Sequence, residues 1–270
     1  MVAASKMRKA QLGALAGRPY ANLLNRVLQS VAARSEENTH ELLRAREVKK
    51  ELVLVISTDK GLCGALNTNL LREVAKFDPG RTVFVALGRK GMQYLARAGR
   101  TVLAQFELKE GFHFLDSKAI SKFLMEKFMT GEVDRVTVVF TDFVNTLTQV
   151  PRAKTILPIA SLAVTADVFG HSESHLPATA AEDQTQYLFE PEAGDVLGAV
   201  LPHYVHFQVY QMVLDARASE HSARMVAMKN ATDNAKQLIK DLTLEYNKIR
   251  QASITTELLE ITTAQMALGQ

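Results

Sequence analysis

The sequence predicts an α/β protein that combines a mostly parallel β-sheet domain with a long antiparallel α-helical coiled coil formed by the two ends of the chain. Both ends are rich in helix-forming residues, and neither glycine nor proline interrupts the stretch from His203 to Leu268. Between the ends, short apolar runs alternate with amphipathic stretches. The predicted divisions are an N-terminal coiled-coil helix at 1–50, the sheet domain at 51–199 and a C-terminal coiled-coil helix at 200–270.

The C-terminal stretch 203–268 is dominated by residues of high helix propensity, chiefly Ala, Leu, Glu, Lys, Gln, Met and Arg. A helix of this length measures about 100 Å at ~1.5 Å per residue, which is more than a compact core can bury. Its apolar residues step by three and four in a narrow seam, so a helical partner is expected. The seam residues are Val205, Val209, Met212, Ala216, Leu238, Leu242, Tyr246, Ile249, Ile254, Leu258 and Ile261.

The N-terminal residues offer that partner. The segments "MVAASKMRKAQ" and "YANLLNRVLQSVAARSEENTHELLRAREVKK" are again rich in alanine, leucine and arginine at helical spacing. Since both ends are helical and flank a middle of different character, the two helices are expected to pair antiparallel.

The middle of the chain predicts a Rossmann-like sheet. Apolar runs at 52–57, 81–88 and 134–144 have the length and β-branched content of buried strands. The stretches between them, at 64–77, 89–99 and 117–131, have helical spacing. Strands that alternate with helices predict a largely parallel, doubly wound sheet.

Composition excludes several classes of protein. The chain has 270 residues, a net charge of +3 and no run of like charges that would indicate a nucleic-acid-binding arm. No apolar run approaches the length of a transmembrane helix. The single cysteine excludes an internal disulfide. We therefore expect neither a nucleic-acid partner nor a transmembrane segment.

The loop "STDKGLCGALN" follows the first strand and precedes a helix, which is the context of phosphate-binding loops. Its glycines, Gly61 and Gly64, have the spacing of neither the dinucleotide fingerprint nor the P-loop. Cys63 between them would need a positioned base to act as a nucleophile, and no histidine pattern points to this loop. A tight turn in which Cys63 is a packing or contact residue is the favoured interpretation.

No other cluster indicates catalysis. The pairs His203 with His206 and His171 with His175 have helical separations, but no third ligand lies in a local motif with either pair. We expect no catalytic, cofactor-binding or metal-binding residues. A different kind of site is indicated near the C-terminus, where Arg250, Gln251, Ser253, Thr255, Thr256 and Glu257 place short polar side chains along the long helix. Such a stretch is typical of a surface that a partner grips.

Several segments together resemble the gamma subunits of F-type ATP synthases. They are "MVAASKMRKAQ", "GRPYA", "STDKGLCGALNTNL", "NTLTQVP", "YLFEP", "SEHSARMVAMKNATDNA" and "YNKIRQASITTELLEI". The resemblance implies a central-stalk rotor that couples proton flow through a membrane ring to ATP synthesis and hydrolysis in an alpha/beta hexamer, without being catalytic itself. It also implies an epsilon subunit as partner, no cofactor, and a peripheral position on the cytoplasmic side of the bacterial inner membrane.

The resemblance also implies roles for individual residues. Contacts with the hexamer are expected from Arg224, Gln251, Thr255 and Glu257 on the long helix and from Asp59, Lys60 and Cys63 in the glycine loop. Contacts with the ring or epsilon are expected from Tyr187, Phe189 and Glu190.

Two alternatives remain open from the residues alone. A Rossmann-type nucleotide-binding protein with helical arms would use the turn at Gly61 and Gly64, and its ligand binding would be lost in Gly64→Val. A coiled-coil adaptor would form a stable homodimer through the long helix.

Overall fold

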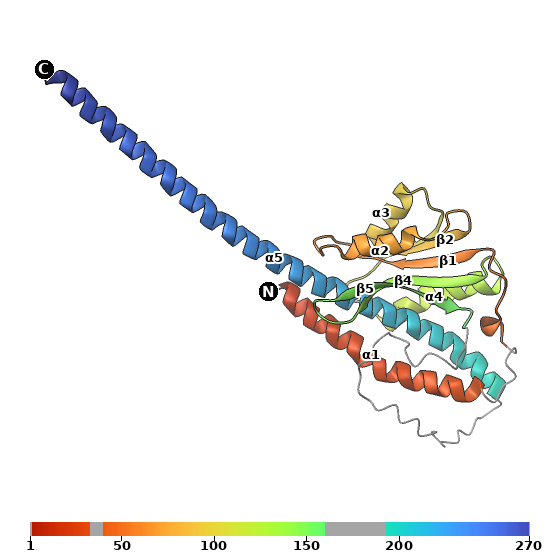
Figure 1. The fold of residues 1–270 in the computed structure, drawn as a ribbon. Helices are drawn as coiled ribbons and strands as arrows, with labels where there is room; N and C mark the ends of the chain where they lie inside the picture. The colour runs from red at the N-terminus through yellow and green to blue at the C-terminus, as the bar shows by residue number, and fades with distance from the viewer. Residues whose placement is uncertain (1, 33–39, 160–192, 270) are drawn as a thin grey trace. The chain divides into compact units, whose positions relative to one another are not determined.

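The computed structural model describes residues 2–32, 40–159 and 193–269. The chain divides into two compact units, Met1–Met225 and Val226–Gln270. The first contains a five-stranded sheet with helices on both faces (Figure 1), and the second contains the last part of the C-terminal helix. Among the described residues, no helix has both the length and the apolar character needed to cross a membrane.

The sheet has the strand order β3-β2-β1-β4-β5. Strands β1 (Glu51–Ile56), β2 (Thr82–Leu87), β3 (Val102–Phe106) and β4 (Arg135–Phe143) run parallel, while β5 (Gln149–Leu157) is antiparallel to β4. The order of the strands reverses at β1, which pairs with both β2 and β4. The predicted mostly parallel, Rossmann-like sheet is confirmed.

Helices lie on both faces of this sheet. On one face are α2 (Leu66–Ala75) and α3 (Arg89–Arg97), and on the other is α4 (Phe114–Met129) with the first part of α5 (Ala193–Leu268) (Figure 1). Helix α1 (Val2–Ala32) runs beside this part of α5.

The alternation of side chains along β1 builds both cores. Val53 and Val55 pack with α2 and α3, whereas Leu52, Leu54 and Ile56 pack with α4 and α5. All are buried, because successive strand residues point to opposite faces and helices cover both. The uninterrupted apolar run that predicted this strand is the direct result.

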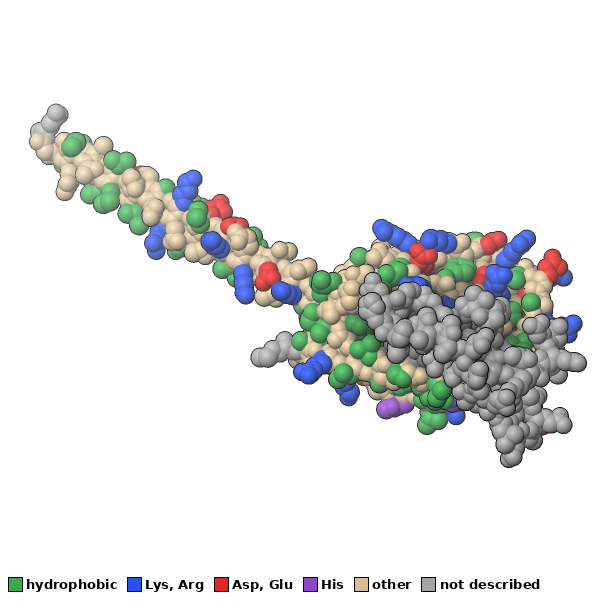
Figure 2. Space-filling model, turned by 60° about the horizontal axis from the view of Figure 1, so that its bottom comes forward, with side chains coloured by type: hydrophobic (Ala, Val, Ile, Leu, Met, Phe, Trp, Pro, Cys, Tyr) green, Lys and Arg blue, Asp and Glu red, His purple; other side chains and the backbone are tan. Residues whose placement is uncertain are grey.

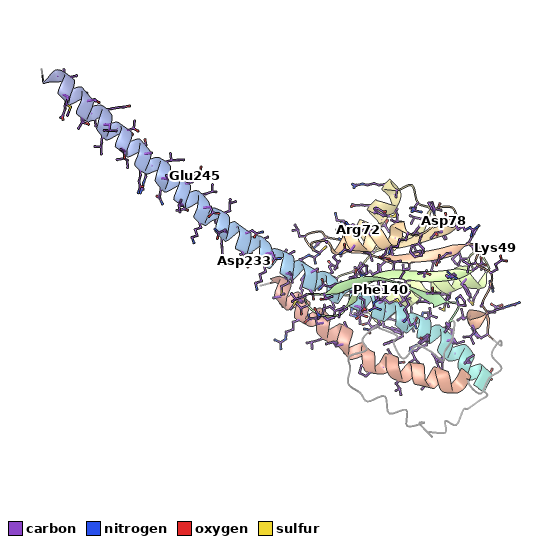
Figure 3. All side chains as sticks on the ribbon, in the orientation of Figure 1. Lys49, Arg72, Asp78, Phe140, Asp233 and Glu245 are labelled. Carbon is purple, nitrogen blue, oxygen red and sulfur yellow. The ribbon has the colours of Figure 1, made fainter. Side chains whose placement is uncertain are left out.

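Strands β3 and β5 were not predicted from the sequence. Both are edge strands, so each lies beside only one neighbour and is partly exposed. In β5, Pro151, Arg152 and Lys154 interrupt the apolar pattern. A proline is tolerated there because an edge strand needs fewer ladder hydrogen bonds. The inner strand β4 differs, since its Phe140, labelled in Figure 3, belongs to the buried core.

Helices α1 and α5 pair antiparallel within the first unit, as the sequence predicts. Gln11 hydrogen-bonds Ser222 at 3.5 Å, while further along α1 the Tyr20 hydroxyl lies 2.8 Å from Nε2 of His203. The close approach depends on Gly17, because a Cβ at this position would lie 2.2 Å from Oε1 of Gln211. The residue numbers of the bonded partners decrease along α5, from 222 to 203, as they increase along α1, from 11 to 20, so the two helices run antiparallel.

The ends of the two long helices differ from the prediction. A helix reaching Lys50 was expected, but the described part of α1 ends at Ala32, and within the described residues 40–50 the one helical element is a short 3₁₀ turn at Glu41–Leu43. The backbone N–H groups of Lys49 and Lys50 instead donate to the Asp134 carboxylate, which aligns the entry to β1. The predicted N-terminal helix was therefore too long.

Helix α5 begins earlier than expected, at Ala193, and includes Pro202. Leu197, Leu201 and Val205 are spaced four apart and are buried in the core. Their burial outweighs the backbone hydrogen bond that the proline removes.

Candidate functional site

The loop between β1 and α2 is closed by its own polar side chains. Asn67 donates to the Thr58 hydroxyl at 2.8 Å, and that hydroxyl donates to the carbonyl oxygen of Lys60 at 2.8 Å. The Asp59 carboxylate accepts from the backbone N–H of Arg89 at 2.9 Å, so it caps the first turn of α3. Hence Asp59, which was expected to contact a partner, also has a structural bond within the chain.

Cys63 lies inside this loop. Its side chain is only 2% exposed, and Nδ2 of Asn67 donates to its Sγ at 3.3 Å. Asn67 is the one side chain in the described residues that hydrogen-bonds the thiol. A nucleophile would need a base in that place, so the arrangement favours the packing interpretation over the catalytic one.

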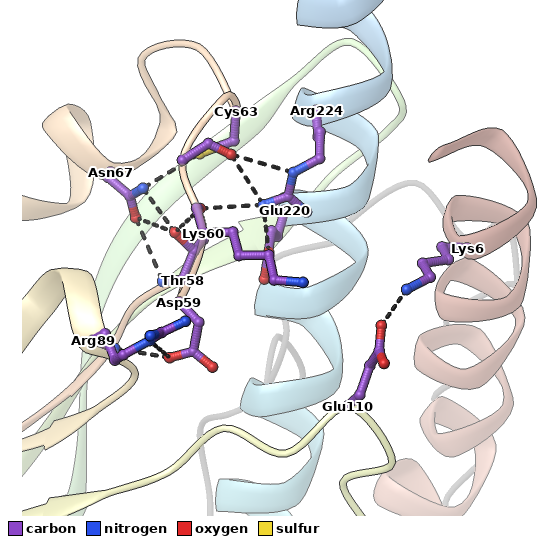
Figure 4. A network of polar contacts seen from close by, with 11 residues as sticks. Lys6, Thr58, Asp59, Lys60, Cys63, Asn67, Arg89, Glu110, Glu220 and Arg224 are labelled. Atoms are coloured by element: carbon purple, nitrogen blue, oxygen red, sulfur yellow. Dashed lines mark hydrogen bonds and ion pairs between the residues drawn. The ribbon is translucent and has the colours of Figure 1, made fainter. Parts of the chain in front are cut away.

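Arg224 of α5 holds the same loop from the opposite side (Figure 4). Its Nη2 donates to the carbonyl oxygens of Lys60 and Gly61 at 3.2 and 3.3 Å, and its Nε donates to Gly61 at 3.3 Å. Glu220, one turn earlier, accepts from Arg224 at 2.7 Å and orients it. The structure thus brings Lys60 and Arg224, predicted separately from the sequence, into direct contact.

Neighbouring residues of α5 bind two further segments, one that follows β3 and one within the last residues of β4. Arg217 donates to the carbonyl oxygen of Lys109 at 2.5 Å, and Ser219 donates to the carbonyl oxygen of Thr141 at 3.1 Å. An ion pair between Lys6 of α1 and Glu110 lies beside these contacts. One short segment of α5, 217–224, therefore ties together the carboxyl ends of β1, β3 and β4.

The segment 217–224 also contains His221, whose pKa depends on its burial and on the charged side chains around it. Burial and, after it, the cations Arg224, Arg217 and Lys6 together lower the pKa of His221 to about 4, while Glu110 opposes the shift. Burial also lowers the pKa of Arg217. The imidazole of His221 is therefore neutral among cations at neutral pH.

The same geometry bears on the nucleotide-binding alternative. In doubly wound sheets, ligands bind beyond the carboxyl ends of the strands where the strand order reverses. Here this edge, next to β1 and β4, is covered by Arg217, Ser219 and Arg224 of the chain itself. Within the described ranges, no group of three or more His, Cys, Asp or Glu side chains is placed to hold a metal ion.

The remaining predicted contact residues of the long helix lie in the second unit. Gln251, Thr255 and Glu257 are exposed. The Thr255 hydroxyl donates to the carbonyl oxygen of Gln251 at 2.9 Å, and Ser253 donates to Glu257 at 3.4 Å. Figure 3 shows side chains of this unit, including Asp233 and Glu245, extending outward from the helix.

Large apolar side chains are also exposed along this unit, and Figure 2 shows them on its surface. They are Met228, Leu238, Ile239, Leu242, Leu244, Tyr246, Ile249, Ile254, Leu258, Leu259, Ile261, Met266 and Leu268. The last cation is Arg250, so the final turns carry only apolar, polar and acidic side chains. Apolar exposure on this scale marks a surface that a partner covers.

Some residues were missed or could not be placed. The pair Glu220 and Arg224 has the i,i+4 spacing of a helical ion pair, so sequence reasoning could have found Glu220. Nothing local marks Arg217. The predicted ring contacts, Tyr187, Phe189 and Glu190, lie outside the described residues.

Known proteins are similar to this chain over nearly its whole length. A family model described as ATP synthase matches residues 1–268. The ATP synthase gamma chain of Methylacidiphilum infernorum (isolate V4) is 47% identical over 274 residues, covering 100% of this chain and 92% of that relative. The gamma chain of Opitutus terrae is 46% identical over 268 residues, covering 99% of this chain and 90% of that relative.

Solved structures show the same fold. The mitochondrial ATP synthase central stalk and c-ring of Tetrahymena thermophila contains a chain that aligns with a TM-score of 0.62 at 23% identity, covering 86% of this chain and 96% of that chain. A chain of the Euglena gracilis mitochondrial ATP synthase aligns with a TM-score of 0.60 at 19% identity, covering 98% of this chain and 95% of that one.

Proposed function

This chain belongs to the ATP synthase gamma-chain family, and we propose that it is the central-stalk rotor subunit of an F-type ATP synthase. In this role it mechanically couples proton flow through a membrane ring to ATP synthesis and hydrolysis in a hexamer of alpha and beta subunits. The observation that carries the proposal is similarity along the full chain, including both helical ends.

The two units support this role in different ways. In the first, the antiparallel contacts of α1 and α5 and the bonds of Arg217 and Arg224 join helices and sheet into one body. In the second, an exposed apolar and polar helix needs a partner that encloses it. A rotor requires both properties, because torque passes through a stiff body to a surface that other subunits grip.

The subunit is proposed to perform no chemistry itself. The edge of the sheet at which a doubly wound protein would bind a nucleotide is covered by Arg217, Ser219 and Arg224 of the chain itself. A phosphate site needs free backbone N–H groups at a glycine-rich turn, and the glycine spacing here matches neither common motif. The catalytic sites are assigned to the hexamer.

The proposed contacts follow from the same role. Asp59, Lys60 and Arg224 form one contact region toward the hexamer, in which Cys63, expected as a contact, is instead buried behind the loop surface. A second contact region includes Gln251, Thr255 and Glu257. Tyr187, Phe189 and Glu190 are assigned to the ring and the epsilon subunit. The proposed location is the cytoplasmic side of the bacterial inner membrane, as a peripheral part of the synthase.

Reconstitution tests the proposal. The full chain is mixed with alpha and beta subunits of the same organism, and a stoichiometric complex with ATP hydrolysis is expected. Isothermal titration of the chain alone with ATP should show no saturable micromolar binding. Micromolar ATP binding without assembly would instead favour the nucleotide-binding alternative, and a stable homodimer without assembly would favour the adaptor.

A further inference from the structure

Leu62, in the loop between β1 and α2, has an unusual backbone conformation. Its φ is 62°, and it is the one non-glycine residue with positive φ among the described residues. For a residue with a Cβ, this left-handed region is unfavourable, and glycine is the usual occupant. Gly64, with a φ of 59°, occupies the same region two positions later without that penalty.

The side chain of Leu62 does not offset the backbone strain by packing in the core of the chain. Its side chain is 77% exposed, although a leucine normally contributes to stability by being buried. The loop is held by other residues, since Thr58, Asn67 and Arg224 make its hydrogen bonds. A glycine at position 62 would therefore serve the isolated chain better, and the reason for a leucine lies outside this chain.

Both sides of Leu62 are anchored. The carbonyl oxygen of Gly61, directly before it, accepts from Nη2 and Nε of Arg224. Cys63, directly after it, is buried against Asn67. An apolar side chain displayed from such a restrained loop loses little further entropy when it binds.

We propose that Leu62 is the anchor of the loop's contact with the alpha/beta hexamer, and that it inserts into an apolar pocket on that partner. This rests on the proposed rotor function and identifies which loop residue makes the contact: Leu62 is presented outward, whereas Cys63 packs behind it. We assign the partner of Leu62 to the hexamer for the following reason. The loop is bonded to Arg224, which comes two residues before Val226 in the sequence, and Val226 begins the unit that the hexamer would enclose. The exposed Lys60 beside Leu62 forms the polar rim of the contact.

The test compares Leu62→Gly, Leu62→Met and the control Met129→Asn, in the full chain. Met129 is another exposed apolar residue, at the end of α4. Leu62→Gly should keep or raise the melting temperature by about 2 °C, because it removes the strain. It should also raise the half-saturation concentration for assembly with alpha and beta subunits by about tenfold or more, as loss of a buried leucine predicts.

Leu62→Met keeps an apolar side chain and should assemble as the wild type does, and Met129→Asn should change assembly little. Unchanged assembly of Leu62→Gly, with normal assembly of the wild type, would overturn the role of Leu62 and leave the rotor function standing. Failure of the wild type itself to assemble would contradict the rotor function. A loss confined to binding of the membrane ring, or to self-association, would also overturn the proposal, since it assigns the pocket to the hexamer.

Discussion

The guanidinium of Arg224 lies against the backbone carbonyl oxygen of Gly61, with both Nε and Nη2 at 3.3 Å. The two residues are far apart in the sequence, and the contact joins the long helix to the loop after the first strand. Because the acceptor is a backbone oxygen, the contact depends on Arg224 and on the shape of the loop. Changes at Arg224 should therefore affect the loop as a whole.

Arg224→Ala is expected to lower the free energy of unfolding by about 1–3 kcal/mol, because the nearly buried Glu220 carboxylate loses its partner. Hydrogen exchange of the backbone N–H groups at 61–64 should become faster. Denaturant unfolding and exchange mass spectrometry measure the two effects. Arg97→Ala, at an exposed position on α3, is the control and should stay within about 0.5 kcal/mol. Unchanged exchange in Arg224→Ala would show that the loop is held without this bond.

Gly17→Ala should destabilise the pair of α1 and α5 by about 1–3 kcal/mol, because the added Cβ would lie 2.2 Å from Oε1 of the buried Gln211. Gly13→Ala on the same helix is the matched control. It has no atom within 4 Å of the added carbon and should stabilise by about 0.5–1 kcal/mol through helix propensity. Thermal unfolding of both variants separates packing from propensity, and equal effects would contradict the close approach at Gly17.

His221 should make the free energy of unfolding decrease as the pH is lowered from 6.5 toward 4. Its pKa is lowered from 6.5 to about 4 in the folded chain, so between these values the unfolded chain binds a proton that the folded chain does not. Stability is therefore complete above pH 6.5 and declines as the pH falls toward 4. The loss is at most ~1.4 kcal/mol per pH unit, and about half of that after solvent screening of a half-exposed group.

The measurement compares wild type with His221→Asn by urea unfolding at pH 7 and pH 5. The wild type should lose about 1 kcal/mol more than the variant between the two values. The comparison cancels groups that titrate in both proteins. Arg217, Arg224, Lys6 and Glu110, which face His221, remain in place in both. A parallel decline of the two proteins would assign the pH dependence to other groups.

The double variant Gln251→Ala with Thr255→Ala should lower coupled ATP synthesis or ATP-driven rotation in the assembled complex. The isolated chain should keep its stability within about 0.5 kcal/mol, because both residues are exposed. Gln237→Ala with Thr243→Ala, exposed on the same unit, is the matched control for the loss of helix-surface polar groups. Normal coupling in the first double variant would exclude the gripping role of these two residues.

The sequence alone determined the parts of this protein that depend on local pattern. The long C-terminal helix follows from the absence of glycine and proline over 203–268, and β1, β2 and β4 follow from continuous apolar runs because both of their faces are covered. The edge strands β3 and β5 escaped detection, since a strand exposed on one side has no such run. The sequence placed the start of α5 too late because Pro202 is unfavourable inside a helix. The burial of Leu197 and Leu201 in the core stabilises the helix through this proline.

Only the tertiary structure decided how the contact residues are arranged. Asp59, Lys60 and Arg224 were expected individually, but the bonds from Asp59 to Arg89 and from Arg224 to the loop carbonyl oxygens join residues that no local spacing connects. The burial of Cys63 and the strained exposure of Leu62 likewise depend on how the loop closes against α5. Periodicity and propensity act between residues that are close in sequence, whereas a hydrogen bond from a helix to a distant backbone oxygen exists only once the chain has folded.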